Sequence, residues 1–155
     1  MSLEKRLKII NLLDNSNTLL DLDIAQKEEL DYFKNHKIQV STIISYHNYS
    51  ETPDDKYLDK IIDRMKRYNP AIYKISTFCK TEKDALRLLQ LQQELKKQNK
   101  KHIVLGMGKF GTITRVFGTL FGNEMIYAPE KLMESSAEGQ LTKDKLKEIF
   151  RALGA

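Results

Sequence analysis

The sequence has very little cysteine and no long apolar run. Its one cysteine, Cys79, cannot form an intramolecular disulfide. No stretch of about 18 apolar residues is present, so no transmembrane helix and no membrane partner are predicted. The sequence also shows no N-terminal signal peptide, in which charged residues precede an apolar stretch, and we therefore expect a cytoplasmic protein. The chain has no internal repeat, low-complexity segment or linker rich in proline or glycine, which predicts a single domain over residues 1–155.

Acidic residues are fewer than basic ones, 21 against 26, and the net charge is +5. A basic balance can indicate nucleic-acid binding. The lysines, however, are spread over predicted helix faces and are concentrated only at residues 96–101, at the end of a predicted helix. Cations are favoured there by the helix dipole. We therefore expect no nucleic-acid partner, and we expect the charge to attract a small anionic substrate.

Short apolar runs alternate with segments of helical periodicity. The runs predict strands at residues 19–24, 40–46, 72–76, 103–105 and 124–127. Helices are predicted at 3–13, 26–35, 54–68, 81–97, 113–121 and 142–153, and Leu86, Leu89 and Leu95 are expected to face inward in the fourth. Because strands that alternate with helices form parallel sheets, we predict an α/β fold with about five parallel strands.

Lys74 is an ionisable residue within an apolar strand. One interpretation is an edge-strand lysine whose stem reaches water. The flanking residues Ile72, Tyr73 and Ile75 instead favour a strand that is covered on both faces. A desolvated lysine loses proton affinity and becomes a nucleophilic amine. The position therefore predicts the chemistry of a Schiff-base enzyme.

His47 lies at the end of the preceding predicted strand. On its own it could be a core histidine that binds a backbone carbonyl. The single helix predicted between His47 and Lys74 fits a βαβ crossover, so the two strand ends should be neighbours. Ligands collect at the carboxyl ends of parallel strands, where an imidazole can act as acid and base. We expect the two residues to share a site.

All seven glycines follow position 105, and three of them form a G-x-G-x-x-G motif, Gly106 to Gly111. In a nucleotide-binding unit this turn would hold a pyrophosphate, and Glu130 would bind a ribose. Such a unit normally starts its sheet, whereas only one predicted strand and one helix follow the next helix here. A nucleotide-binding module therefore stands as an alternative.

Three further features belong to the last third of the chain. Arg115 follows the glycine motif and is either a fork for a carboxylate or a surface arginine. Residues 135–140 form a small, polar segment that is either a plain loop or a lid. The three histidines and Cys79 do not have the spacing of a metal-ligand set, so no metal is predicted.

Four ordered motifs resemble the type I 3-dehydroquinate dehydratases of the shikimate pathway of aromatic amino acid biosynthesis. They are residues 43–53 (IISYHNYSETP), 69–75 (NPAIYKI), 106–115 (GMGKFGTITR) and 136–140 (SAEGQ). The resemblance implies a (β/α)8 (TIM-type) barrel and a lyase that converts 3-dehydroquinate to 3-dehydroshikimate through an imine, with no cofactor. The glycine motif then becomes a close-packed turn that positions Arg115.

The resemblance also implies roles for particular residues. Lys74 would form the Schiff base, and His47 would remove and return protons. Arg115 would hold the substrate carboxylate, while Ser136 and Gln140 would belong to the closing loop. Asp21 matches an aspartate of a family strand and would be a supporting acid.

The chain departs from the family in its length. A (β/α)8 barrel typically needs about 250 residues, and the resemblance begins at a helix before the family's fourth strand. We therefore expect an incomplete barrel. The absent strands carry the family's glutamate that partners the histidine and arginines that contact substrate, and we expect no segment of this chain to replace them.

The incomplete barrel predicts open sheet edges at residues 19–24 and 124–127. Because soluble proteins cover or close such edges, we expect a homo-oligomer or a companion chain. Two copies would contribute ten of the predicted strands, so simple closure by a homodimer is not expected. The alternative to an active lyase is a noncatalytic remnant of the family that acts in assembly or ligand binding.

Overall fold

Strands and helices alternate along the chain in the computed structural model, which describes residues 2–155 without the side chain of Leu132. The elements are α1 (Leu3–Leu12), β1 (Leu19–Asp23), α2 (Lys27–Asn35), β2 (Ser41–Asn48), α3 (Asp55–Lys66), β3 (Ile72–Phe78), α4 (Glu82–Lys97), β4 (His102–Met107), α5 (Gly108–Phe121), the short 3₁₀ helix η1 (Leu132–Glu134) and α6 (Lys143–Ala152). The predicted alternation is confirmed, and α5 begins five residues earlier than expected. No helix within the described residues is long and apolar enough to cross a membrane.

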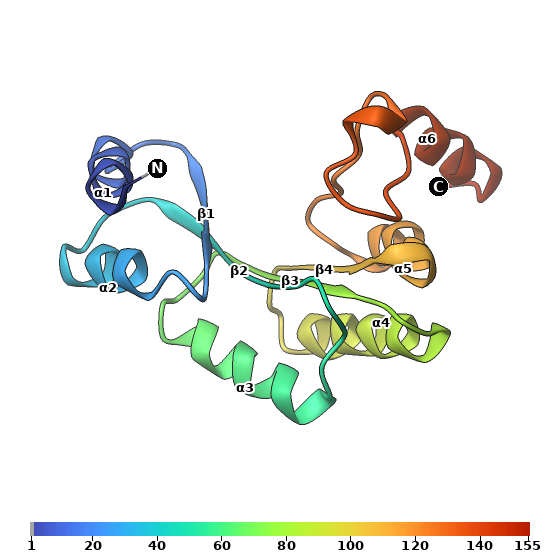
Figure 1. Ribbon diagram of the computed structural model, residues 1–155, viewed down its shortest axis with the longest axis horizontal. Helices are drawn as coiled ribbons and strands as arrows, with labels where there is room; N and C mark the ends of the chain where they lie inside the picture. The colour runs from blue at the N-terminus through green and yellow to red at the C-terminus, as the bar shows by residue number, and fades with distance from the viewer. Residues whose placement is uncertain (1) are drawn as a thin grey trace.

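The four strands form one parallel sheet in the order β1-β2-β3-β4 (Figure 1). Helices α3 and α4 lie on one side of this sheet, and the segment that leads to α6 lies on the other. Ser45 of β2 pairs with Lys74 of β3, and His47 pairs with Ser76. Because side chains alternate between the faces of a strand, Lys74 and His47 project from the same face of the sheet.

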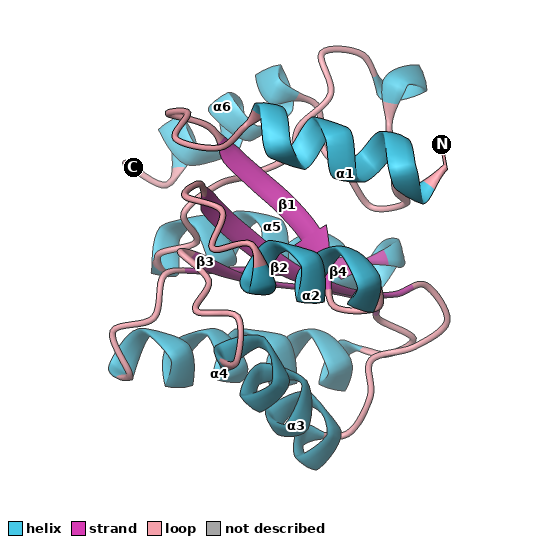
Figure 2. Cartoon of the chain, turned by 90° about the vertical axis from the view of Figure 1, so that its left-hand side faces the viewer, coloured by secondary structure: helices cyan, strands magenta, loops and turns pink. Residues whose placement is uncertain are grey.

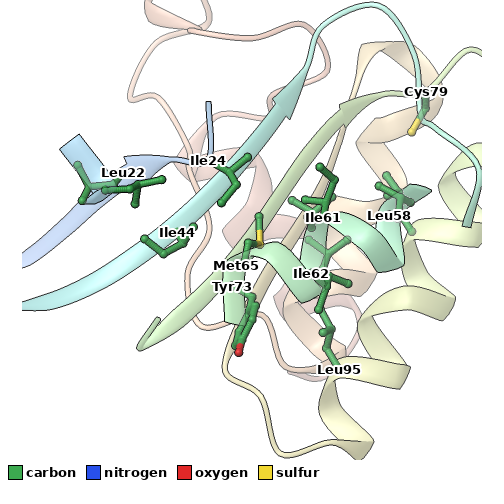
Figure 3. Packing of buried hydrophobic residues seen from close by; sticks show 14 of the residues in the cluster. Leu22, Ile24, Ile44, Leu58, Ile61, Ile62, Met65, Tyr73, Cys79 and Leu95 are labelled. Atoms are coloured by element: carbon green, nitrogen blue, oxygen red, sulfur yellow. The ribbon is translucent and has the colours of Figure 1, made fainter. Parts of the chain in front are cut away.

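A hydrophobic core fills the space between the sheet and α3. Its α3 members are Leu58, Ile61, Ile62 and Met65, which recur at helical spacing and are buried (Figure 3). Asp54 caps the start of the helix, and its side chain accepts a hydrogen bond from the Tyr57 N–H. The face that α3 buries was therefore predictable from its sequence pattern.

The inward face of α4 differs from the prediction. Leu86 is 58% exposed, whereas Ala85, Leu88, Gln92 and Leu95 are buried. Leu86 is two residues from Leu88 and so lies about 200° around the helix from it. The expectation that Leu86 faces inward is wrong, because the buried stripe includes the polar Gln92, whose Nε2 donates to the Gly118 carbonyl.

Residues 124–127 do not form the predicted fifth strand. Within residues 2–155 the sheet ends at β4. The side chain of Asn123 occupies the place of a neighbouring strand: its Oδ1 accepts from the Val104 N–H at 2.8 Å and its Nδ2 donates to the Val104 carbonyl at 3.1 Å. One amide therefore satisfies both backbone groups of Val104.

Other groups complete the cover over the outer edge of β4. The Gly106 N–H donates to Thr114 Oγ1 at 2.7 Å, and the Glu124 N–H donates to the His102 carbonyl at 2.9 Å. The expectation of an open edge at residues 124–127 is therefore wrong, because side chains and one loop amide pair with β4 in place of a strand.

The opposite edge of the sheet is open. Figure 2 shows β1 at the upper edge of the sheet, and no other strand of the described chain lies beside its outer side. Here Gln26 Oε1 accepts from the Asp23 N–H at 3.1 Å. The open edge predicted at residues 19–24 is confirmed.

Candidate active site

The carboxyl ends of β2, β3 and β4 line a cavity of about 190 Å³ together with α5 and the segment before α6. Its lining residues are His47, Tyr49, Lys74, Ser76, Leu105, Met107, Arg115, Tyr127, Ser136, Ala137 and Gln140. Five of the six predicted site residues therefore lie together. The sixth, Asp21, contacts the cavity through Lys74.

Lys74 is largely buried and paired. Its side chain is 12% exposed, and its Nζ donates to Asp21 Oδ2 at 2.7 Å. The same nitrogen lies 4.7 Å from the centroid of the Tyr127 ring. A buried charge requires a partner, and Asp21 supplies it. Asp21, which the family resemblance gives as a supporting acid, is therefore the partner of Lys74.

His47 also pairs with an aspartate of β1. Its Nδ1 donates to Asp23 Oδ2 at 2.7 Å, and the Ala25 N–H donates to Asp23 Oδ1 at 2.8 Å. Burial raises the pKa of Asp23, but the hydrogen bonds from His47 and Ala25 outweigh it and leave that pKa below the ordinary value. The Tyr49 ring stacks on His47 with 6.0 Å between centroids. The imidazole is thus held on two sides.

Asp23 is the site residue that the sequence analysis missed. The expectation that no segment of this chain supplies an acid for His47 is wrong, because β1 does so. Asp21 and Asp23 are two residues apart on one strand, and a strand places such residues on the same face. That alternation is the signal that would have found Asp23, since Asp23 pairs in register with Ser45, two residues before His47.

Arg115 is buried at the inner side of α5. It is 2% exposed, and its Nε and Nη1 are buried without a hydrogen-bond partner in the described chain. Burial lowers the pKa of its guanidinium. An unpaired buried cation is costly, so the arrangement favours an anion in the cavity beside it.

The glycine motif explains why Arg115 lies so deep. A Cβ on Gly111 would lie 2.3 Å from the carbonyl carbon of Gly106, so the backbones of β4 and α5 touch. Gly108 begins α5 with φ of +77°, a conformation that glycine adopts readily. The predicted close-packed turn is present, and it carries Arg115 to the cavity.

Residues 135–140 close one side of the cavity. Gln140 Oε1 accepts from the Ser136 N–H at 2.8 Å, and Gln140 Nε2 donates to Ser136 Oγ at 3.2 Å. The Gly108 N–H donates to the Glu138 carbonyl at 3.0 Å, which ties the segment to the start of α5. Ser136 and Gln140 thus line the cavity, and their role in a lid stays a prediction.

The comparisons with known proteins agree with this geometry. A family model described as type I 3-dehydroquinase matches residues 2–155. The chain belongs to the type I 3-dehydroquinase family. It is 30% identical over 154 residues to the 3-dehydroquinate dehydratase of Methanococcus maripaludis, covering 97% of this chain and 68% of that protein. The Methanocaldococcus jannaschii dehydratase is 32% identical with the same coverage.

Solved structures of type I dehydroquinase relatives share the fold. The Clostridium difficile type I enzyme superposes with a TM-score of 0.81 at 27% identity, covering 99% of this chain and 62% of that one. The Geobacillus kaustophilus dehydratase gives a TM-score of 0.84 at 26% identity, covering 61% of that chain. The chain therefore spans about two thirds of its relatives' length, and the predicted incomplete barrel is confirmed.

Within a type I dehydroquinase site, the nucleotide-binding alternative loses its support. The N–H of Gly108, at the helix terminus that a pyrophosphate would need, already donates to the Glu138 carbonyl. Glu130, the residue expected to bind a ribose, is exposed and pairs with Lys143 at 2.9 Å. It is not among the residues that line the cavity. The motif therefore serves helix packing.

Proposed function

We propose that this chain dehydrates 3-dehydroquinate to 3-dehydroshikimate through a Schiff base on Lys74, as a lyase of the shikimate pathway. The observation that carries the proposal is one cavity lined by Lys74, His47 and an unpaired, buried Arg115. These groups supply a nucleophile, a proton carrier and an anion receptor. A keto acid is the class of substrate that needs all three.

The first step joins Lys74 to the substrate ketone. The ammonium transfers a proton to Asp21, whose Oδ2 lies 2.7 Å from Nζ, and the free amine then attacks the carbonyl carbon. Loss of one water from the carbinolamine leaves a protonated imine. This cation withdraws electrons from the neighbouring C–H bond and so acidifies it.

The elimination then needs a group that moves protons. His47 has its Nδ1 fixed by Asp23, and its Nε2 has no hydrogen-bond partner within residues 2–155. That nitrogen takes the carbon proton, which forms an enamine, and returns a proton to the departing hydroxyl as a second water leaves. Hydrolysis of the imine consumes one water and frees Lys74, so the net reaction releases one water.

Arg115 orients the substrate in this scheme. A guanidinium binds a carboxylate through charge-assisted hydrogen bonds, and the buried, unpaired Nε and Nη1 of Arg115 offer donors for such bonds. Ser136 and Gln140 close over the bound molecule. The solved Clostridium difficile relative carries covalently modified comenic acid, which supports a covalent step in this family.

Borohydride trapping tests the proposal. Incubation with 3-dehydroquinate and borohydride, followed by peptide mass spectrometry, should add the reduced substrate to Lys74. Lys74→Ala should abolish the adduct, whereas Lys60→Ala, a matched change on the exposed face of α3, should leave it unchanged. A wild-type chain that stays unmodified would instead support the noncatalytic remnant.

We also propose that a further strand, from a second copy or a companion chain, pairs with β1. The support is the open outer edge of β1, beside which lie the carboxylates that hold Lys74 and His47. Because β4 is already covered, the partner is expected at one edge only. The cytoplasmic location and the absence of a nucleic-acid partner stay predictions.

A further inference from the structure

Lys74 has an aromatic neighbour in addition to its carboxylate. The Nζ atom lies 4.7 Å from the centroid of the Tyr127 ring, and both residues line the cavity. We propose that Tyr127 is a catalytic residue that keeps the Lys74 nitrogen positively charged after it becomes an imine. The inference rests on the Schiff-base function proposed above.

Backbone hydrogen bonds before and after Tyr127 in the sequence hold its ring over the nitrogen. Upstream, the Glu124 N–H donates to the His102 carbonyl at 2.9 Å. Downstream, the Pro129 carbonyl accepts from the Lys143 N–H at 3.0 Å. Tyr127 itself is 36% exposed, so much of its surface is covered. The segment that failed to form a fifth strand thus carries this ring across the cavity.

The reaction changes the number of N–H groups on the lysine nitrogen. The resting ammonium has three, whereas a protonated imine has one. The hydrogen bond to Asp21 depends on an N–H, but attraction to an aromatic face depends only on positive charge. The ring therefore keeps its interaction through the ammonium, the protonated imine and the conjugated imine of the product. It has no comparable attraction for the neutral imine.

This preference bears on catalysis because only the protonated imine is a strong electron sink. A ring that favours the charged form raises the share of imine that can undergo proton abstraction. The other ionisable groups around the cavity are Asp21 and Asp23 from β1, His47 from β2, Arg115 from α5 and the phenol of Tyr49. Among the described residues, Tyr127 is the one whose aromatic ring lies over Nζ.

The experiment measures the pH dependence of borohydride trapping at Lys74 in the full chain with 3-dehydroquinate. Tyr127→Leu removes the ring but keeps an apolar side chain, and it should lower the trapped fraction roughly 2- to 30-fold at the alkaline end, the range expected for a cation–π contact. Tyr127→Phe keeps the ring and should rescue trapping. Tyr57→Leu, which removes a partly exposed tyrosine of α3 outside the cavity, is the matched control.

The outcomes separate this inference from the proposed function. If the wild-type chain is never labelled, the Schiff-base proposal itself fails. If the wild type is labelled and Tyr127→Leu follows the same pH profile, the role of Tyr127 is refuted while the dehydratase proposal stands. Trapping in Tyr127→Phe that matches Tyr127→Leu would also refute it. Thermal melting checks folding, and Tyr127→Met replaces the leucine variant if that variant does not fold.

Discussion

Lys74 and His47 each form a hydrogen bond with a different aspartate of β1. Lys74 donates to Asp21, and His47 donates to Asp23, both at 2.7 Å. These pairs give the amine and the imidazole separate partners, so the two groups can play different chemical parts in one small cavity. Arg115 has no such partner in the described chain, which fits a group that awaits an anion.

The first residue-scale prediction concerns His47. We expect His47→Ala to preserve trapping of the imine at Lys74 but to slow turnover by about 100- to 10,000-fold, the usual contribution of a general acid–base. Steady-state kinetics and borohydride trapping on the same preparations measure both quantities. His36→Ala, which changes an exposed histidine at the end of α2, is the control. Unchanged turnover in His47→Ala would refute the assignment.

The second residue-scale prediction concerns acid stability. The pKa of Asp23 is lower in the folded protein than its ordinary value of 3.8. Its ionisation therefore contributes stability above pH 3.8, and this contribution is lost as the pH falls through the lower folded-state pKa. Asp23→Asn should melt below the wild type near neutral pH, and the gap should close at acid pH.

Thermal melting across the pH range measures this effect. Asp59→Asn, on the exposed face of α3, controls for the loss of any aspartate. A gap between wild type and Asp23→Asn that stays constant down to the acid limit would show that the Asp23 carboxylate is not held by its contacts with His47 and Ala25.

At the scale of elements, the sheet ends differently at its two sides. The outer edge of β1 is open, whereas Asn123, Thr114 and the Glu124 amide satisfy the backbone of β4. The same cover starts the segment that places Tyr127 over Lys74. Edge protection and site assembly are therefore coupled at β4.

Asn123→Ala tests this cover. Val104 is 1% exposed, so its N–H and carbonyl would be left without partners, and we expect a loss of about 1–3 kcal/mol in the free energy of unfolding. Asn123→Asp should also lose stability, because it keeps the acceptor for the Val104 N–H but places a carboxylate oxygen against the Val104 carbonyl. Urea unfolding measures these changes, with Asn17→Ala as an exposed control. A loss within error of the control would contradict the capping role.

At the scale of the whole molecule, four strands stand where a complete barrel has eight. The prediction of five strands implied ten in a dimer, whereas the observed sheet implies eight. Closure of that barrel would still require the partner's β1 to displace the Asn123 side chain from β4. Pairing at β1 alone needs no such displacement.

Light scattering tests the expected partner. We expect the purified chain to form a stable oligomer or to associate with a companion chain, because the β1 edge is open. Thr18→Lys, which puts a lysine at the exposed start of this edge, should weaken association if the edge is the interface. Asp63→Lys on exposed α3 is the control for an added lysine. A well-folded, active monomer would contradict the proposal.

Much of the fold and site followed from local patterns. The βα alternation, the α3 stripe, the turn from Gly106 to Gly111 and the positions of His47 and Lys74 each depend on residues close in sequence. The prediction of a fifth strand was wrong because an apolar run near residue 125 cannot indicate that the Asn123 side chain already pairs with the edge of β4. Leu86 was misplaced because the buried stripe of α4 includes a polar residue.

The sequence by itself determined the order of strands and helices and the chemical types that end at the cavity, because hydrophobic periodicity and turn residues act over short distances. Only the tertiary structure decided that Asp23 holds His47, that Tyr127 covers Lys74 and that β4 is capped while β1 is not. Those outcomes depend on contacts between residues far apart in the chain, which exist only after the sheet has brought its strands together.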